Sequence, residues 1–184
     1  MRVVIGEDEA LLREGLVLLL RRGGLDVVAT AADAGALLAA VAAHGPDLVL
    51  TDIRMPPDRT DDGLRAALRV RAERPGTAVV VLSQHVQRRY AVELLAERPS
   101  GVGYLLKQRV ADVDNFCADL RRVAAGGTAL DPEVVTLMLS AARAADPVAR
   151  LSPRRREVLG LIAEGRTNAA IARSLADDGD GGDG

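Results

Sequence analysis

The segment DLVLTDIRMPP, residues 47–57, decides the fold, because a continuously apolar run ends on an aspartate and then turns through two prolines. A run without polar alternation is typical of a parallel strand that is covered on both faces. The carboxylate of Asp52 at the end of this strand costs desolvation energy unless something there uses its charge. An ordinary alternative is that Asp52 only helps to form the turn before the prolines.

Apolar strands alternate with helical patterns along residues 1–126. This alternation predicts an α/β fold with a doubly wound, five-stranded parallel sheet and helices on both faces. The spacing of apolar residues places the elements. The predicted strands are residues 2–6, 25–30, 47–51, 77–83 and 102–107, and the predicted helices are residues 9–22, 33–44, 62–73, 88–97 and 111–126.

Polar groups in such sheets act beyond the carboxyl ends of the strands. Glu7 and Asp8 follow the first predicted strand, and Asp52 follows the third. Ser83 ends the fourth strand and Lys107 ends the fifth. Taken singly, each has an ordinary explanation as a helix-start acid, a turn residue or a solvated strand end. Their convergence on one edge favours a shared site.

Carboxylates gathered at one edge repel one another, and a divalent cation removes the conflict. Oxygen ligands of this kind suit Mg²⁺, which supports phosphoryl transfer by neutralising charge. Asp52 would be the nucleophile that forms an aspartyl phosphate, and Ser83 would donate a hydrogen bond to a phosphoryl oxygen. Arginine outnumbers lysine 23 to 1, so Lys107 is a candidate for a role that arginine cannot fill, pairing with the phosphoryl group as a point charge.

Five segments together resemble the receiver domain of bacterial two-component response regulators: GEDEALLREGL, PDLVLTDIRMPP, GLRAALRVR, VVVLS and GYLLK. The resemblance covers residues 1–126 and implies a flavodoxin/CheY-like sheet with strand order 2-1-3-4-5. It implies that a sensor histidine kinase phosphorylates Asp52. It also implies that Glu7, Asp8, Asp52 and the backbone carbonyl of Arg54 hold Mg²⁺, with Asp8 a more direct ligand than Glu7.

The same resemblance assigns a conformational switch. Ser83 would be the switch hydroxyl, and Tyr104 the switch aromatic that turns inward when Ser83 moves. Tyr104 has the alternative of being an ordinary half-buried strand residue.

The only chemistry expected is Mg²⁺-dependent self-phosphorylation and autodephosphorylation on Asp52. An enzyme acting on small phosphate esters is disfavoured, because the sequence shows no segment for a cap domain or substrate pocket.

The remaining sequence predicts a smaller second part. Residues 127–150 read as a linker with one helix, which starts at Asp131-Pro132-Glu133. The segment LSPRRREVLGLIAEGRTNAAIA resembles the start of the LuxR-type helix-turn-helix of NarL/FixJ regulators, so residues 151–176 are expected to be a partial all-α helix-turn-helix. Residues 177–184, which are only Asp and Gly, are expected to be a disordered acidic tail without a recognition helix.

Two functions follow from this organisation. The first is a response regulator that dimerises on phosphorylation and controls transcription; DNA binding is expected of a full-length parent and is doubtful for this chain. The second is a phosphorylation-dependent interaction or dimerisation module, or a phosphate sink, that does not bind DNA. The net charge of −2 is the sum of −2 over residues 1–149, +4 over residues 150–176 and −4 over residues 177–184, and the acidic end would oppose DNA.

The composition indicates the number of domains and the cellular environment of the chain. The chain has 184 residues, of which 48% are hydrophobic, enough for one full domain and a smaller part. No apolar run approaches the length of a membrane span, about 18 residues. One cysteine, Cys117, excludes an internal disulfide framework, and its place in a helical pattern predicts a buried structural thiol. A cytoplasmic location is expected.

Overall fold

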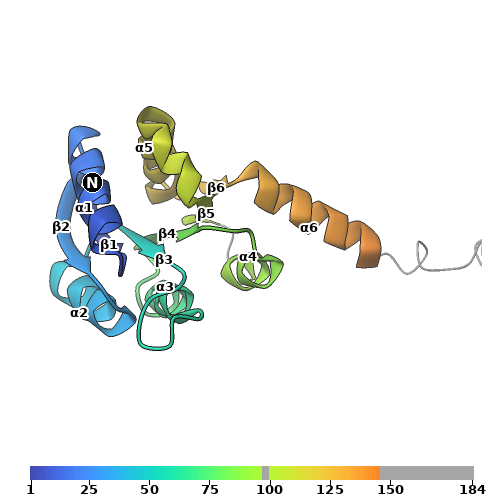
Figure 1. The fold of residues 1–184 in the computed structure, drawn as a ribbon, viewed down its shortest axis with the longest axis horizontal. Coiled ribbons are helices and arrows are strands. Elements are labelled where there is room, and N and C mark those ends of the chain that lie inside the picture. Colours follow the sequence, from blue (N-terminus) through green and yellow to red (C-terminus); the bar gives the residue numbers. More distant parts are fainter. Residues whose placement is uncertain (97–99, 146–184) are drawn as a thin grey trace, which may run out of the picture. The chain divides into compact units, whose positions relative to one another are not determined.

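In the computed structural model, which describes residues 1–96 and 100–145, six strands form one parallel sheet (Figure 1). Their order is β2-β1-β3-β4-β5-β6, and every neighbouring pair is parallel. The parallel α/β fold and the predicted order of the first five strands are confirmed. The bounds are β1 (Arg2–Gly6), β2 (Asp26–Ala31), β3 (Leu48–Asp52), β4 (Ala78–Ser83), β5 (Val102–Leu106) and β6 (Thr128–Leu130).

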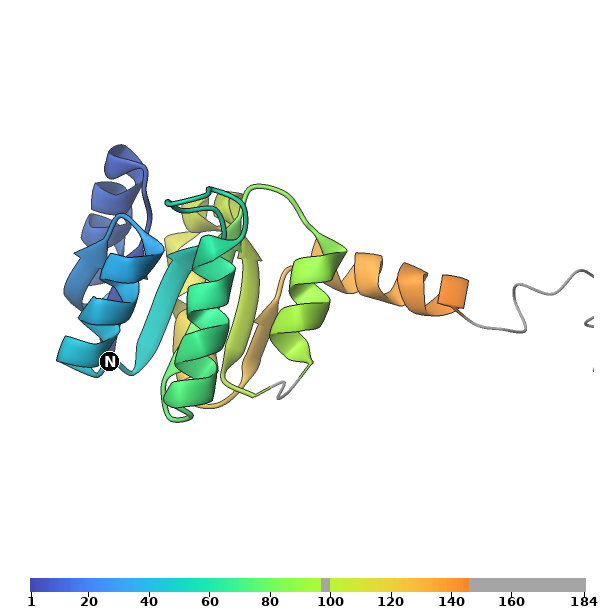
Figure 2. The same cartoon turned by 90° about the horizontal axis from the view of Figure 1, so that it is seen from below.

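Helices cover both faces of the sheet. Helices α1 and α5 lie on one face, and α2, α3 and α4 lie on the other (Figures 1 and 2). Asp33 caps α2 as the sequence predicts, because its Oδ1 accepts a hydrogen bond of 2.7 Å from the backbone N–H of Ala36. The bounds are α1 (Ala10–Arg22), α2 (Ala34–His44), α3 (Asp62–Glu73), α4 (Arg88–Leu95), the 3₁₀ helix η1 (Lys107–Ala111), α5 (Val113–Ala124) and α6 (Pro132–Ala145).

The central strands are apolar throughout because both of their faces are buried. Val49 of β3 packs in the core that includes α2, α3 and α4, whereas its neighbours Leu48 and Leu50 pack in the core that includes α1 and α5. Full burial of one such side chain stabilises the fold by about 1.5–3 kcal/mol. Packing on both faces therefore fixes the end of β3, and with it the position of Asp52.

The sheet is one strand wider than the predicted five. The short β6 pairs with β5, and its Ala129 is buried. This strand lies within residues 127–150, which the sequence indicates as linker. Residues Met1–Met138 form one compact unit, so the sheet and the first turns of α6 belong together. Lys107 also differs slightly from prediction, because β5 ends at Leu106 and Lys107 begins η1.

The predicted linker helix is present as α6 and begins at Pro132, directly after Asp131. Val134 on its first turn is fully buried in the core that also contains Leu94 of α4. Within residues 1–96 and 100–145, no helix has the length and apolarity needed to cross a lipid bilayer. The predicted helix-turn-helix (151–176) and acidic tail (177–184) lie outside the described residues.

Candidate functional site

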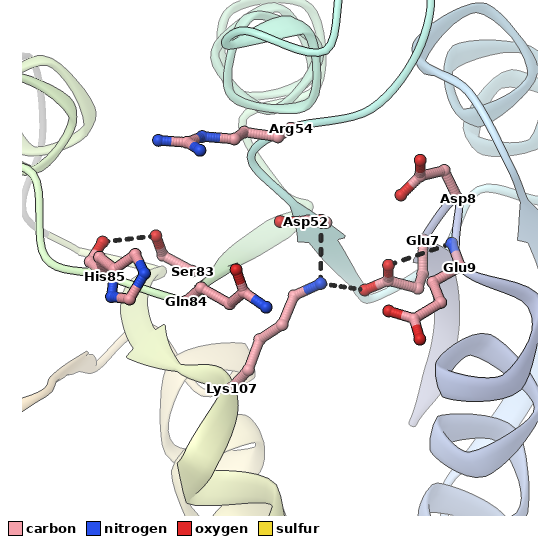
Figure 3. A pocket seen from close by; sticks show the side chains of 9 residues that line it. All are labelled: Glu7, Asp8, Glu9, Asp52, Arg54, Ser83, Gln84, His85 and Lys107. Atoms are coloured by element: carbon pink, nitrogen blue, oxygen red, sulfur yellow. Dashed lines mark hydrogen bonds and ion pairs between the residues drawn. The ribbon is translucent and has the colours of Figure 1, made fainter.

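Residues from the carboxyl ends of several strands line one pocket of about 160 Å³ (Figure 3). It opens where the sheet topology predicts a site, at the ends of β1, β3 and β4 and at the start of η1. Of the predicted site residues the pocket gathers six, and Tyr104 does not line it. The lining residues are Glu7, Asp8, Glu9, Asp52, Arg54, Ser83, Gln84, His85 and Lys107.

Lys107 joins two of the acids. Its Nζ lies 2.9 Å from Glu7 Oε2 and 2.9 Å from Asp52 Oδ2. Figure 3 shows its side chain rising from η1 to end between them. The Glu7 side chain is only 1% exposed, that of Asp52 is 11% exposed and that of Lys107 is 17% exposed. Water therefore screens these ion pairs far less than it screens surface pairs.

The environment shifts the pKa values of Glu7 and Lys107. Burial raises the pKa of Glu7, and the hydrogen bond from Lys107 opposes this rise without cancelling it. Burial also lowers the pKa of Lys107, but its hydrogen bonds to Glu7 and Asp52 outweigh that effect, so its pKa lies above the ordinary value. Lys107 is therefore an ammonium at neutral pH, and it supplies a fixed positive charge beside Asp52.

The acids form a donor set suited to a hard cation. Glu7, Asp8 and Asp52 each offer a carboxylate oxygen, and these oxygens lie within 4.8 Å of one another. Carboxylate oxygens at this spacing, open to a water-accessible pocket, fit Mg²⁺, which retains several waters and takes few protein ligands. Arg54 lines the same pocket, and its own side chain is exposed.

Close backbone packing positions Asp52. The backbone N–H of Gly63, at the start of α3, donates a hydrogen bond of 3.0 Å to the carbonyl of Ile53. A Cβ atom built on Gly63 would lie 1.8 Å from the Asp52 carbonyl oxygen, far closer than atoms can approach. The Thr51 hydroxyl also donates to that carbonyl oxygen, at 2.9 Å. The loop that follows β3 can therefore fold back on Asp52 only because residue 63 is glycine.

Ser83 and Tyr104 meet at the same backbone oxygen. The Ser83 hydroxyl donates to the carbonyl of His85 at 2.7 Å, and the Tyr104 hydroxyl lies 3.4 Å from it. The Gln87 N–H donates to the Tyr104 hydroxyl at 3.3 Å. Tyr104 is fully buried, so it already points inward, and the predicted inward turn stays a prediction. His85 itself is exposed and lines the pocket.

Sequence reasoning missed Arg59 as a member of this neighbourhood. Its Nη1 lies 3.0 Å from Asp8 Oδ2, although Arg59 belongs to the irregular segment between β3 and α3. An arginine among several others in a polar loop carries no periodic signal. Its left-handed backbone, with φ of 55°, is also invisible in the sequence.

Comparison with known proteins identifies the family. The model of the response regulator receiver domain matches residues 3–115. The chain belongs to the response regulators. The oxygen regulatory protein NreC of Staphylococcus carnosus is 32% identical over 185 residues, which span 95% of this chain and 82% of NreC. NreC of Staphylococcus haemolyticus matches to the same extent.

Solved structures of other response regulators share the fold. RcsB of Salmonella typhimurium aligns with a TM-score of 0.66 and 25% identity, over 96% of this chain and 84% of RcsB. The receiver domain of a putative NarL from Mycobacterium tuberculosis aligns with a TM-score of 0.54 and 34% identity, over 64% of this chain and 93% of that domain. Response regulators act with histidine kinases, and their receiver domains generally bind Mg²⁺. This chain is therefore a regulator of a two-component system and not a classical enzyme.

Proposed function

We propose that Asp52 of this response regulator accepts a phosphoryl group from a sensor histidine kinase and that the phosphorylated chain controls transcription. The observation that supports this most directly is the contact of Lys107 Nζ with Asp52 Oδ2 at 2.9 Å, inside a pocket that Ser83 also lines. A nucleophilic carboxylate, a fixed cation and a hydroxyl donor at one strand edge are the groups that phosphoryl transfer needs.

Each group has a role in the transfer. A carboxylate oxygen of Asp52 forms a bond to phosphorus as the bond from phosphorus to the kinase histidine nitrogen breaks. Lys107, which is an ammonium at neutral pH, pairs with the negative charge of the phosphoryl oxygens. Mg²⁺, held by Glu7, Asp8, Asp52 and the carbonyl of Arg54, would neutralise further charge on the transferred group.

Ser83 and Tyr104 would transmit the change. A phosphoryl oxygen on Asp52 is a stronger acceptor than the His85 carbonyl, which now accepts the Ser83 hydroxyl at 2.7 Å. When the Ser83 hydroxyl turns to the phosphoryl group, the His85 carbonyl loses that hydrogen bond and retains its contact with the Tyr104 hydroxyl. The segment between β4 and α4 would then change its conformation around the Tyr104 hydroxyl. The result is a shift between two populations of that segment.

The output of this shift is a changed interaction surface. Val92, on the outer face of α4, is 46% exposed and lines a shallow groove with Arg88, Arg89 and Glu93. We propose that phosphorylated chains form a homodimer through the exposed face of α4, since β5 is buried along its length between β4 and β6. The related regulator RcsB has been solved as dimers bound to DNA.

We also propose a cytoplasmic location for this regulator, because its kinase donor and the chromosome lie there.

Labelling with acetyl phosphate tests the site. Wild type and Asp52→Asn are incubated with the donor, with and without Mg²⁺, and intact masses are compared. We expect one phosphoryl adduct that requires Mg²⁺ and is absent from Asp52→Asn. An Asp58→Asn variant is the control, because Asp58 is an acid of the same loop that lies outside the pocket lining, and it should be labelled normally. A folded wild type that takes up no adduct, or an Asp52→Asn variant that is labelled equally, would refute the assignment.

A mobility-shift assay separates the two outputs. Phosphorylated and unphosphorylated chain are titrated onto promoter DNA at several salt concentrations, because contacts to phosphates weaken steeply with salt. Sequence-dependent binding that strengthens on phosphorylation supports direct transcription control. Binding that is absent while dimerisation still responds to phosphorylation supports the module that acts through protein contacts.

A further inference from the structure

Asp8 is paired with a different cation from the one that contacts Glu7 and Asp52. Lys107 contacts Glu7 and Asp52, whereas Asp8 Oδ2 receives the Nη1 of Arg59 at 3.0 Å. The Asp8 side chain is 15% exposed and that of Arg59 is 69% exposed, so the guanidinium reaches in from solvent. The three acids of the metal set are thus neutralised by two protein cations from different segments.

We propose that Arg59 competes with the divalent cation for Asp8, and so sets the affinity of this regulator for Mg²⁺. The inference rests on the proposed metal site and adds a residue that lowers its affinity. In the metal-free protein Arg59 holds the Asp8 carboxylate; when the ion binds Asp8, the guanidinium leaves it. Arg59 contributes no ligand oxygen, because a guanidinium has only donors.

Charge explains why the two cations exclude each other. Arg59 and a metal ion would both sit within bonding distance of one carboxylate, so two positive groups would lie only a few ångströms apart. Such like charges repel each other, and water moderates the repulsion here because the Arg59 side chain is 69% exposed. Lys107 poses no such conflict at Asp8, because its contacts are with the other two acids. Arg59 is therefore the group that the ion displaces.

The backbone of Arg59 supports a specific role for its side chain. Its φ of 55° makes it the one non-glycine residue with positive φ among residues 1–96 and 100–145. This left-handed region is disfavoured for residues with a Cβ atom, and such strain concentrates at functional sites. The Arg59 N–H donates to the Met55 carbonyl at 3.1 Å, which holds the turn in this form. A turn that only needed this conformation would be better served by glycine or asparagine.

Calorimetric titration of the unphosphorylated chain with MgCl₂, without a phosphodonor, tests the proposal. Arg59→Ala and Arg59→Gly should both bind Mg²⁺ about two- to five-fold more tightly than wild type, which is the scale of a partly exposed ion pair. The glycine variant tolerates φ of 55° and guards against misfolding of the turn. Arg59→Lys keeps the charge and should stay close to wild type.

Two controls isolate the contact. Arg69→Ala removes the same charge from α3, where Arg69 pairs with Glu73 at 2.7 Å, and should leave Mg²⁺ affinity unchanged. In an Asp8→Asn background, Arg59→Ala should no longer tighten binding, because the two residues act on each other. The difference between Arg59→Ala and wild type should shrink in 1 M KCl, where screening acts within about 3 Å.

The outcomes are separable. Equal or weaker Mg²⁺ binding by both Arg59→Ala and Arg59→Gly overturns the competition, even if wild type binds the ion and is labelled on Asp52. Tightening that persists unchanged in the Asp8→Asn background also overturns it, because the effect would not pass through Asp8. If neither wild type nor the Arg59 variants take up Mg²⁺, the proposed metal site falls together with this inference, while labelling of Asp52 remains a separate question.

Discussion

Replacement of Lys107 by methionine should destabilise the fold by leaving two acids without their cation. The change removes two charged hydrogen bonds of 2.9 Å, to Glu7 and to Asp52, and keeps a side chain of similar length. A charged hydrogen bond contributes about 1.5–3 kcal/mol, and breaking a buried pair costs about 3–5 kcal/mol. The pocket is open to water, and the variant no longer has to bury an ammonium, so both effects reduce the cost. We therefore expect the free energy of unfolding to fall by about 2–4 kcal/mol at neutral pH without Mg²⁺.

Urea unfolding followed by circular dichroism measures this loss. Arg69→Met is the matched control, because its pair with Glu73 is more than half exposed on both sides, and its cost should stay below about 1 kcal/mol. Adding Mg²⁺ should reduce the difference in free energy of unfolding between Lys107→Met and wild type, because the bound ion would neutralise the acids in place of Lys107.

The pH dependence has a defined sign. The pKa of Lys107 is raised, so its contribution is fully present below the ordinary lysine pKa and is lost only as the pH rises through its folded pKa in the strongly alkaline range. In the variant Glu7 loses the hydrogen bond from Lys107 that opposes the effect of burial, so the Glu7 pKa should rise further. A carboxyl whose pKa is raised in the folded state stabilises the fold as the pH falls. The gap between variant and wild type should therefore narrow below neutral pH. An equal or greater stability of Lys107→Met at neutral pH would refute this account.

Three further predictions concern Gly63, Asp112 and Cys117. Gly63→Ala should abolish labelling of Asp52 and destabilise the fold by about 1–3 kcal/mol, whereas Gly76→Ala, where a Cβ meets no atom within 4 Å, should be tolerated. Asp112→Ala should lower the unfolding temperature at neutral pH but not in strong acid, because hydrogen bonds from Asn115 lower the Asp112 pKa and such stability is lost as the pH falls through it. Cys117, which is buried with a raised pKa, should react with a thiol reagent only on unfolding.

Each of these expectations can fail in a defined way. A Gly63→Ala variant labelled at the wild-type rate would show that the Asp52 carbonyl is not held by close packing. If Asp112→Ala lowers the unfolding temperature equally in strong acid, the effect does not come from the ionised Asp112 carboxylate that caps α5. Rapid modification of Cys117 in the folded chain would contradict its burial.

The sequence predicted which polar residues gather at one edge of the sheet, because the carboxyl ends of parallel strands meet there. Once the apolar runs were assigned to strands, the carboxyl end of each strand selected Glu7, Asp52 and Ser83, and the structure places all of them in one pocket. Lys107 was found in the same way, although it begins η1 and does not end β5. The selection needed only the parallel direction of the strands, which the alternation of apolar strands and helices predicts; the strand order was implied by the family resemblance.

What the sequence did not predict depends on tertiary contacts. The three residues of β6 are too few to show a pattern, and their strand conformation comes from pairing with β5. Asp61 stands in a polar turn, yet its side chain is only 12% exposed and pairs with Arg65 at 2.9 Å and Arg89 at 3.3 Å. Arg59 reaches Asp8 across a loop of irregular backbone. Apart from Arg65, which stands four residues after Asp61, each partner is distant in sequence or set by loop geometry, and no local pattern records it.

The pocket gives a physical reason for the single lysine in this arginine-rich chain. Arginine replaces lysine throughout this chain except at position 107. There, a single nitrogen lies 2.9 Å from both Glu7 and Asp52. An ammonium is a compact charge with three donors, so it can serve two acids and still offer a proton to a third oxygen. A guanidinium is a wide planar fork that pairs with one carboxylate through two bonds, and it would fill space in front of Asp52. A pocket of about 160 Å³ that would also admit the proposed phosphoryl group favours the more compact ammonium of lysine.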